Sequence, residues 1–249
     1  MDLQTFFQEH PKVAVAFSGG VDSSYLLWEA VMQGAEVKAY YVQSVFQPEF
    51  EREDALRVAK QTSAQMEILP VDVLADPVIA ANPANRCYYC KQKIFGSILA
   101  AAARDGYPVV LDGTNASDDA DDRPGMKALE ELRVLSPLRL CGLTKSEIRE
   151  HARKAGLPVW NKPAYACLAT RVPAGEPITA ELLAKTERAE NALYRMGFRD
   201  LRVRVPGGTA RIQIPAEQIS LLIENRKAIL EELGQDFREI VLDLRARDE

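Results

Sequence analysis

The sequence has few cysteines and histidines and no long apolar run. Four cysteines among 249 residues are too sparse for a disulfide scaffold. In a reducing compartment, a close cysteine pair is then expected to bind metal or to do redox chemistry. The histidines His10 and His151 lie in contexts that suggest no catalytic role. No apolar run approaches the roughly 18 residues of a membrane helix, and no basic, apolar leader opens the chain. We therefore expect a cytoplasmic protein without membrane contact.

A basic excess is also missing. Lys and Arg number 31 against 36 Asp and Glu, which gives a net charge of -5. Proteins that bind nucleic acid mainly through its phosphates usually carry a positive excess, so a nucleic-acid partner is not expected. The composition is otherwise ordinary, with 47% hydrophobic residues, 14 Gly and 14 Pro. This excludes collagen-like, low-complexity and disordered classes.

Strand and helix patterns alternate through the first two thirds of the chain. Short apolar runs predict strands at 13–17, 37–43, 66–71 and 109–111. Helices are predicted between and after them at 22–33, 50–63 and 94–104. Strands that alternate with helices need crossover connections, so we expect an α/β fold with a parallel sheet covered on both faces.

A different pattern follows the capping box Thr144–Glu147, which begins a helix ending near Lys154. Residues 160–177 have no clear periodicity and predict an irregular connector. The remaining elements are a helix at 179–196, strands at 201–205 and 210–214, a helix at 216–233 and a strand at 239–244. We therefore expect two domains: 1–160, and a smaller α+β domain with its connector at 161–249.

The strongest motif lies between the first strand and the first helix. Its polar and glycine residues are Ser18, Gly19, Gly20, Asp22, Ser23 and Ser24. Two glycines allow a tight turn that directs backbone N–H groups at an anion, and the helix start adds partial positive charge. The loop lacks the lysine of the GxxxxGK[ST] motif and does not fit GxGxxG. It predicts a phosphate cradle, because a simple turn would leave the aspartate and serines unexplained.

This loop resembles the PP-loop of the ATP pyrophosphatase superfamily. The resemblance implies an adenine nucleotide alpha hydrolase-like domain that cleaves ATP between its α- and β-phosphates with Mg²⁺ nearby. Asp22 is the residue that we expect to take part in that step. Members of the superfamily use the cleavage to adenylate an oxygen, so that AMP can leave when a nitrogen or sulfur nucleophile attacks.

Three cysteines bear on the choice of nucleophile. Cys87 and Cys90 form a CxxC motif, and Cys167 lies in the irregular connector. Three thiolates can hold three corners of a [4Fe-4S] cluster and leave one iron open. The pair can equally be a redox dithiol, or the cysteines can have a structural or incidental role. A structural zinc site would need a fourth ligand, and Cys141 is the only cysteine left. The spacing leaves these alternatives open.

Over nearly its whole length the chain resembles the LarE family of ATP-dependent sulfur transferases. The resembling segments are 17–24, 85–91, 111–115, 122–125, 136–138, 142–145, 166–171, 203–204 and 210–212. The resemblance implies adenylation of a carboxylate of pyridinium-3,5-biscarboxylic acid mononucleotide and its conversion to a thiocarboxylate, in the synthesis of the nickel-pincer cofactor of lactate racemase. Thr170 departs from the serine of many relatives.

Two branches of that family differ in their sulfur source. One sacrifices the sulfur of a single cysteine, here Cys167. The other has three cysteines and resembles cluster-dependent tRNA thiolases. Cys87, Cys90 and Cys167 place this chain with the second, so we expect them to bind a [4Fe-4S] cluster. A tRNA thiolase remains the alternative, although the net charge argues against it. An ammonia-using amidotransferase would leave the cysteines without a task, and a nucleotide sensor would not turn over ATP.

Further residues are candidates for nucleotide or substrate binding. Arg202 and Arg204 alternate with apolar residues, so on a strand they share a face that suits phosphate or carboxylate groups. Ser44 ends a strand at the edge where ligands bind in open α/β sheets. The family-like segments add Gly113, Arg123 and Arg171. We interpret the acidic run at 118–122 mainly as a solvated loop. The expected protein is a homo-oligomer that acts on a small nucleotide.

Overall fold

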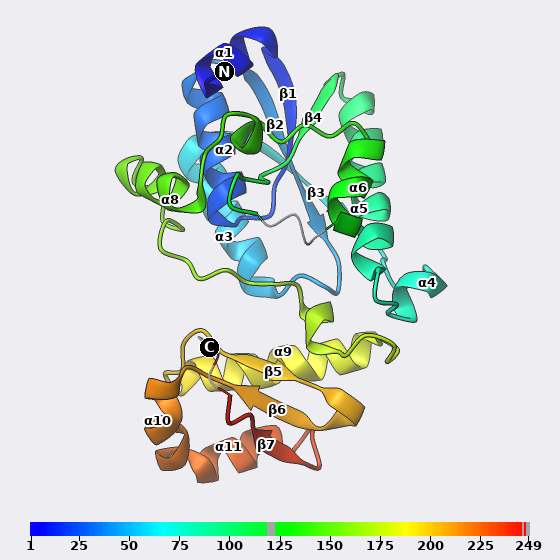
Figure 1. Ribbon diagram of the computed structural model, residues 1–249, viewed down its shortest axis with the longest axis vertical. Coiled ribbons are helices and arrows are strands. Elements are labelled where there is room, and N and C mark those ends of the chain that lie inside the picture. The colour runs from blue at the N-terminus through cyan, green and yellow to red at the C-terminus, as the bar shows by residue number, and fades with distance from the viewer. Residues whose placement is uncertain (119–122, 246, 248–249) are drawn as a thin grey trace. The chain divides into compact units, whose positions relative to one another are not determined.

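The computed structural model describes residues 1–118, 123–245 and 247. The chain forms two compact units (Figure 1). Unit 1 contains Met1–Val73 and Asn85–Ala164, and unit 2 contains Leu74–Ala84 and Tyr165–Glu249. The domain boundary expected after residue 160 lies close to the main division. The short segment Leu74–Ala84 carried no sequence signal that would assign it to unit 2.

Unit 1 is built on a parallel sheet. Among the described residues its strands are β1 (Lys12–Ala16), β2 (Glu36–Gln43), β3 (Gln65–Pro70) and β4 (Val109–Leu111). They lie in the order β3-β2-β1-β4, and every neighbouring pair is parallel. The strands follow the expected ones within one or two residues. The α/β class and the parallel sheet are therefore confirmed.

Alternate side chains of the strands fill two separate cores. Val13 and Val15 of β1 face one core, and Ala14 between them faces the other. The same alternation places Tyr41 of β2 in the first core and Tyr40 in the second. A parallel sheet buried on both faces requires this arrangement, because successive side chains point to opposite sides.

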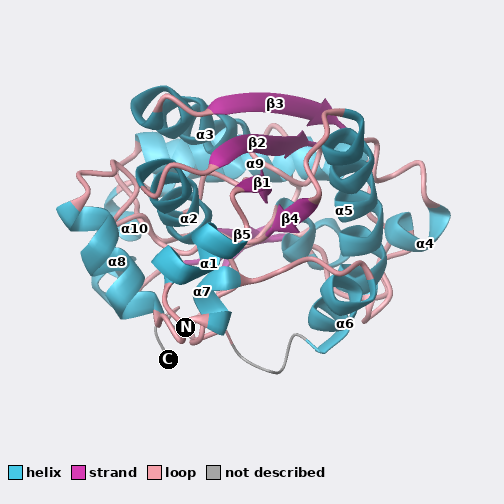
Figure 2. Ribbon diagram, turned by 90° about the horizontal axis from the view of Figure 1, so that it is seen from above, coloured by secondary structure: helices cyan, strands magenta, loops and turns pink. Residues whose placement is uncertain are grey.

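Helices cover both faces of this sheet (Figure 2). The first core is closed by α1 (Leu3–Glu9), α2 (Val21–Met32), α3 (Glu49–Thr62), α7 (Pro137–Leu140) and α8 (Lys145–Lys154). The second core is closed by α5 (Arg86–Arg104) and α6 (Arg123–Glu131). The capping box of α8 is present as predicted, with the Thr144 side chain accepting from the Glu147 N–H and the Glu147 carboxylate accepting from the Thr144 N–H.

Some helices of unit 1 differ from expectation. Helix α5 begins at Arg86 rather than near residue 94, so the CxxC motif lies on its first turn. The first turn contains aromatic and charged residues with no apolar stripe, which explains why periodicity missed it. Helices α1, α6 and α7 were not predicted. Helices α1 and α7 are only seven and four residues long, so they carry little periodic signal.

Unit 2 contains a mixed sheet and packed helices. Its strands β5 (Arg202–Arg204), β6 (Ala210–Gln213) and β7 (Ile240–Leu242) lie in that order, with β5 and β6 antiparallel and β6 and β7 parallel. Helix α9 (Ala180–Arg195) was predicted. The helix expected at 216–233 is broken into a 3₁₀ turn, α10 (Ile219–Glu224) and α11 (Arg226–Leu233), with Asn225 between the last two.

The connector expected at 160–177 is largely irregular, apart from a 3₁₀ turn at Leu168–Arg171. The segment Leu74–Ala84 contributes the short helix α4 (Pro77–Ala80) to unit 2. No helix in the described part of the chain has both the length and the apolar character to cross a membrane.

Candidate functional site

The glycine-rich loop connects β1 to the start of α2. Gly19 has a φ of +74°, a conformation that favours glycine. A Cβ atom there would lie 2.9 Å from the backbone nitrogen of Ala55 and the carbonyl oxygen of Glu51, both on α3. Glycine is therefore required at this position for two reasons: the backbone is left-handed, and a larger residue would clash with α3. The loop is held against α3 in a fixed shape.

The start of α2 is open to an anion. The N-cap residue Gly20 has no side chain that could cap the helix. The hydroxyls of Ser18 and Ser23 lie 3.1 Å apart, and the Ser23 hydroxyl lies 3.3 Å from the Gly20 carbonyl oxygen that it donates to. These contacts set the turn but leave the first N–H groups of the helix for a ligand. Such N–H groups and the helix dipole favour phosphate.

Asp22 lies in the first turn of α2 beside Lys145, the first residue of α8. The Lys145 ammonium donates to Oδ2 of Asp22. Burial raises the pKa of Asp22, and Lys145 opposes that rise. Within the described part of the chain, Oδ1 of Asp22 and Oγ of Ser24 are buried without a hydrogen-bond partner. An orphaned carboxylate oxygen beside a helix start suits a hard cation such as Mg²⁺.

Lys145 was missed as a site residue by sequence reasoning. Its place after Thr144 in the capping box identified the helix but not the ion pair. The pair joins residues 123 positions apart, so no local pattern indicates it. Its ammonium places a positive charge beside the loop, which has no lysine of its own.

The segment after β4 packs directly on the loop. A Cβ atom on Gly113 would lie 2.9 Å from the backbone nitrogen of Ser23. Asp112 accepts from the hydroxyls of Ser136 and Thr114, and burial raises its pKa. Among the described side chains, the Nδ2 group of fully buried Asn115 has no partner. Unit 1 thus brings Gly113 and the loop together at the carboxyl edge of the sheet.

Ser44 follows β2 at the same edge. Its hydroxyl donates to the side chain of Gln47 and accepts from the N–H of Phe46, so it stabilises a local turn. The guanidinium of Arg86 lies over the Phe46 ring, with its Cζ 6.0 Å from the ring centroid. The start of α5 is therefore beside the end of β2, which places the CxxC motif near this edge.

The two cysteines of the motif lie one helical turn apart. Cys87 is exposed and Cys90 is partly buried. Residues three apart on a helix project to the same side, so two thiolates can hold neighbouring corners of a cluster. Across the described residues, no three His, Cys, Asp or Glu side chains form a metal-binding group. Cys167 belongs to unit 2.

Cys167 caps a 3₁₀ turn in unit 2. Its carbonyl oxygen accepts from the N–H and the hydroxyl of Thr170, at 3.0 and 2.8 Å. Thr170 therefore performs the capping role that a serine hydroxyl would perform. The guanidinium of Arg204 donates to the carbonyl oxygen of Thr170 at 3.0 Å. Cys167 and Arg204, a candidate anion-binding residue, are thus linked by hydrogen bonds through Thr170.

Arg171 is fully buried rather than exposed to a ligand. It donates to both carboxylate oxygens of Glu190 at 2.8 and 3.0 Å and to the carbonyl oxygen of Ala166 at 2.8 Å. The Tyr165 hydroxyl and the Val203 N–H also donate to Glu190. This network holds both sides of Cys167 against α9 and β5.

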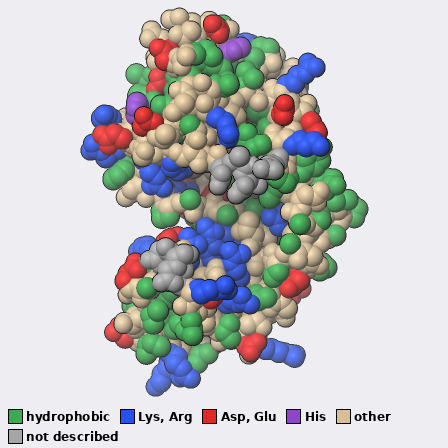
Figure 3. Space-filling view, in the orientation of Figure 1, with side chains coloured by type: hydrophobic (Ala, Val, Ile, Leu, Met, Phe, Trp, Pro, Cys, Tyr) green, Lys and Arg blue, Asp and Glu red, His purple; other side chains and the backbone are tan. Residues whose placement is uncertain are grey.

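Arg202 and Arg204 share one face of β5, as their alternation predicted. Arg204 is paired in register with Arg211 on β6, and Val203 between the two arginines is buried. Burial and the charges of Arg171 and Arg247 lower the pKa of Arg202. Lys and Arg side chains are concentrated on the face of unit 2 that Figure 3 presents. Grouped cations of this kind suit a bound anion.

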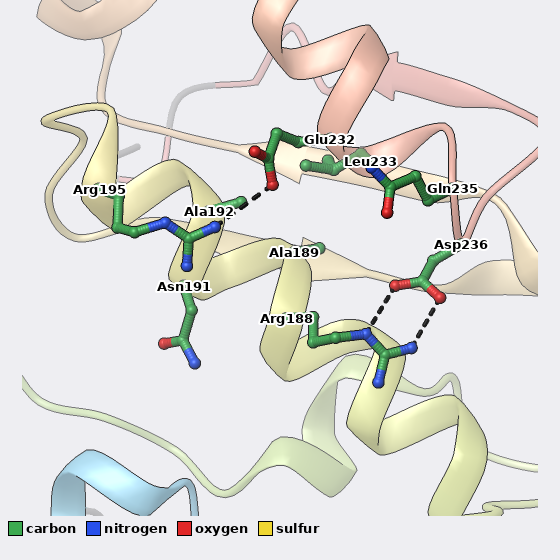
Figure 4. A pocket seen from close by; sticks show the side chains of 9 residues that line it. All are labelled: Arg188, Ala189, Asn191, Ala192, Arg195, Glu232, Leu233, Gln235 and Asp236. Atoms are coloured by element: carbon green, nitrogen blue, oxygen red, sulfur yellow. Dashed lines mark hydrogen bonds and ion pairs between the residues drawn. The ribbon is translucent and has the colours of Figure 1, made fainter.

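Two other features lie outside this arrangement. Residues 119–122 of the acidic run and the side chain of Arg123 are outside the described structure. Asp118, the first residue of the run, accepts from the Asn115 N–H at 2.8 Å. A groove between α9 and α11 (Figure 4) is lined by charged residues that pair within it. Arg188 donates to both oxygens of Asp236, and Arg195 pairs with Glu232. The charged side chains of the groove are therefore paired with one another.

Residues 11–76, which include the loop, match the family model described as tRNA methyl transferase HUP domain. An uncharacterized protein of Synechocystis sp. is 38% identical over 95% of this chain and 88% of its own length. A tRNA-specific 2-thiouridylase of Thermotoga petrophila is 26% identical over 61% of this chain and 54% of its own.

A further relative is the pyridinium-3,5-bisthiocarboxylic acid mononucleotide synthase of Lactiplantibacillus plantarum. It is 33% identical over 94% of this chain and 86% of its own length. The match therefore includes both units, with the glycine-rich loop and the Cys167 turn. The chain belongs to the LarE family of PP-loop sulfur transferases.

Proposed function

We propose that this protein is an ATP-dependent sulfur transferase acting on pyridinium-3,5-biscarboxylic acid mononucleotide. It adenylates a carboxylate of that substrate and converts it to a thiocarboxylate, a step in nickel-pincer nucleotide synthesis. Support comes from the synthase of L. plantarum, whose identity extends over both units. One observation in unit 2 carries the proposal. Thr170 donates to the carbonyl oxygen of Cys167 and accepts from Arg204, so the cysteine and a candidate anion-binding residue are joined through one turn.

The groups of unit 1 suit the activation step. A carboxylate oxygen of the substrate attacks the α-phosphorus of ATP, and the bond to pyrophosphate breaks. The open start of α2 and Lys145 would hold the leaving pyrophosphate, because N–H groups and an ammonium stabilise its charge. Mg²⁺ would take Oδ1 of Asp22 as a ligand. The product is an acyl adenylate, which is a far better electrophile than a carboxylate.

The groups of unit 2 suit substrate binding and sulfur transfer. Arg202 and Arg204 would bind the substrate's phosphate or carboxylates. A sulfur nucleophile attacks the acyl carbon, the carbon–oxygen bond to AMP breaks, and AMP leaves with the oxygen. The Arg171–Glu190 network would keep the Cys167 turn in one conformation during this step.

The three cysteines support a [4Fe-4S] cluster bound by Cys87, Cys90 and Cys167. When bound, such a cluster supplies an open iron that can carry a replaceable sulfide. Two thiolates on the first turn of α5 fit two corners, and Cys167 would provide the third. The alternative source is Cys167 itself, which would lose its sulfur and become dehydroalanine. A cluster allows repeated turnover, whereas a sacrificial cysteine allows one transfer.

Metal and product analyses test this proposal. Anaerobically purified protein should contain iron and acid-labile sulfide, and Cys87→Ala, Cys90→Ala and Cys167→Ala should each remove both. One bound zinc without iron would overturn the cluster. AMP should be released only when the dicarboxylate substrate is present, whereas a nucleotide sensor would release none. If the iron-free protein forms one thiocarboxylate and its mass falls by the elements of H₂S at Cys167, the sulfur came from that cysteine and the sacrificial route is correct.

A tRNA thiolase is a second candidate because of the similarity to tRNA-specific 2-thiouridylase. A filter-binding measurement with bulk tRNA separates the two activities. Tight, salt-sensitive retention would favour the thiolase, and no retention would favour the small nucleotide.

We also propose a cytoplasmic homo-oligomer. Large apolar side chains are exposed on unit 2, including Ile223 on α10 and Leu230 on α11, and a second copy could bury them. Light scattering behind size exclusion decides between an oligomer and a monomer.

A further inference from the structure

Arg149 joins α8 to the chain that follows this helix. It lies one turn after Lys145, so the two side chains share a face of α8. Burial raises the pKa of Asp22, whereas Lys145 and then Arg149 lower it. The Arg149 guanidinium nevertheless donates its hydrogen bonds elsewhere, to the carbonyl oxygen of Lys162 at 2.8 Å and to that of Trp160 at 3.4 Å. Arg149 therefore lies near the nucleotide loop but holds the segment that follows α8.

Residues 159–162 form a compact turn, which we call the strap. The Lys162 N–H donates to the Val159 carbonyl oxygen at 3.1 Å, and Val159 is buried in the first core. The Lys162 ammonium lies 2.8 Å from Oδ2 of Asp54 and 5.0 Å from the centroid of the Phe50 ring, both on α3. The side chains of this ion pair are 15% and 17% exposed, so salt screens it less than an exposed pair. The strap therefore joins α8 to α3.

These contacts close a ring that includes the phosphate cradle. Helix α3 meets the glycine-rich loop directly after Asp54, because a Cβ atom on Gly19 would lie 2.9 Å from the backbone nitrogen of Ala55. Helix α8 meets the start of α2 through the ion pair of Lys145 with Asp22. The strap ties α8 to α3, so it helps to set the position of the Lys145 ammonium relative to the loop. Every member of the ring belongs to unit 1.

We propose that Arg149 is a positioning residue for ATP activation, which acts through the strap to fix the Lys145 end of α8 relative to the glycine-rich loop. The inference rests on the proposed function, because it needs the phosphates of ATP in the loop. A planar guanidinium suits this task, since its forked N–H groups can bond two carbonyl oxygens at once. A lysine would keep the positive charge near Asp22 but could not reproduce the fork. Comparison of the two side chains therefore separates positioning from charge.

Binding of α,β-methylene-ATP and Mg²⁺ to the full-length protein tests this role, because the analogue cannot be cleaved between its α- and β-phosphates. In calorimetry, Arg149→Lys and Arg149→Met should each bind it about tenfold more weakly than the parent, a typical coupling between neighbouring groups. Arg153→Lys is the matched control, because Arg153 lies one turn further along α8 in an exposed pair with Glu150. Its affinity should equal that of the parent.

The far side of the ring provides a second variant. Asp54→Asn removes the charge that holds Lys162 on α3, so it should also weaken binding of the analogue. The double variant Arg149→Lys/Asp54→Asn should bind little more weakly than the weaker single variant, because either change opens the same ring. Losses that add in full would show that the two residues act separately, and would overturn the role of the strap.

The fluorescence of Trp160 reports on the strap directly. Trp160 is exposed, and the sequence has one other tryptophan, Trp28, so a Trp28→Phe background isolates its signal. Acrylamide should quench Trp160 more strongly in Arg149→Lys and Arg149→Met than in the parent, because the strap loses its bonds to α8. Quenching in Arg153→Lys should match the parent.

Each outcome decides the question. If Arg149→Met fails to fold, Arg149→Lys and Asp54→Asn carry the test. Parental affinity in Arg149→Lys would overturn the proposal, because the charge alone would then be enough. Weakened affinity with unchanged quenching would also overturn it, since the effect would not pass through the strap. A parent that does not bind the analogue would reject the proposal together with the activation step. Weakened binding in the variants of a parent that forms no thiocarboxylate would support the role of Arg149 and reject the proposed function.

Discussion

Arg204 on β5 and Arg211 on β6 lie directly opposite each other in the antiparallel pair. Like charges in this position destabilise a sheet. The pKa of Arg204 is lowered by burial and by the charges of Arg171, Arg247 and Arg211. We infer that this pair of arginines binds an anionic ligand, because a bound phosphate or carboxylate removes the repulsion between them.

Inorganic phosphate should therefore stabilise this protein. Without phosphate, we expect Arg204→Leu to change the melting temperature little, because the removal of a repulsive charge offsets the loss of the Arg204 hydrogen bonds to Thr170 and Gln213. Phosphate binding should weaken about tenfold, which corresponds to one lost charge-assisted hydrogen bond. Thermal shift with a phosphate titration measures both effects. Arg195→Leu, which removes an exposed arginine of α9, is the control. Equal phosphate shifts in all three proteins would exclude Arg204 from the anion site.

Gly113→Ala should disturb the nucleotide loop. The added methyl group would lie 2.9 Å from the backbone nitrogen of Ser23, so the start of α2 must shift. Overpacking of this kind costs about 1–3 kcal/mol, and the KM for ATP should rise. Gly96→Ala is the control because nothing lies within 4 Å of its added Cβ; the helix should gain stability. An unchanged KM for Gly113→Ala would show that Gly113 does not support the loop.

Glu190→Gln should destabilise unit 2 and free the Cys167 turn. The substitution leaves the buried Arg171 guanidinium without its counter-charge, and breaking a buried pair costs about 3–5 kcal/mol. Urea denaturation measures the loss, and faster reaction of Cys167 with a thiol reagent below the transition reports the local effect. Glu150→Gln breaks an exposed pair with Arg153 and should change neither. A stable Glu190→Gln protein with unaltered thiol reactivity contradicts a positioning role.

The charge of Asp22 should cost stability in the ligand-free protein. Burial raises its pKa above the ordinary 3.8, so the folded state holds the proton more tightly than the unfolded chain. That contribution to stability is complete below pH 3.8 and is lost as pH rises through the folded pKa. Asp22→Asn should therefore be more stable than the parent at neutral pH, and the difference should shrink in acid.

The same substitution should lower Mg·ATP turnover by on the order of a hundredfold. Asp236 is the matched control, because Arg188 lowers its pKa and Asp236→Asn should lose stability at neutral pH. Denaturation across a pH series and an AMP assay provide the two measurements. Full turnover by Asp22→Asn would remove Asp22 from the site.

Local sequence patterns predicted the helices and strands whose apolar residues recur at a regular spacing. Strands β1 and β4 are short apolar runs, and β2 and β3 are apolar stretches interrupted by Lys38 and Glu67. The loop before α2 has glycines where a turn is needed. The predicted start of α5 was wrong because Arg86–Cys90 has no apolar stripe. The break at Asn225 within the predicted helix 216–233 was also missed, since its flanking residues keep a helical pattern.

Contacts between distant residues could not be predicted from local patterns. Lys145 reaches Asp22 across 123 positions, and Asn82 reaches Glu176 across 94. Arg171 stands in a family-like segment that suggested a ligand contact, but its burial depends on Glu190 of α9. Such placements follow from tertiary packing, which a single sequence does not reveal.

The stoichiometry of the products tests the central claim most directly. The anaerobic protein, loaded with iron and sulfide, is mixed with Mg·ATP, pyridinium-3,5-biscarboxylic acid mononucleotide and excess sulfide. AMP and thiocarboxylate are then quantified by liquid chromatography and mass spectrometry. Our account predicts equal amounts of the two, and no thiocarboxylate from Cys167→Ala. AMP without any sulfur-containing product, or thiocarboxylate formed by Cys167→Ala at the parental rate, would contradict it.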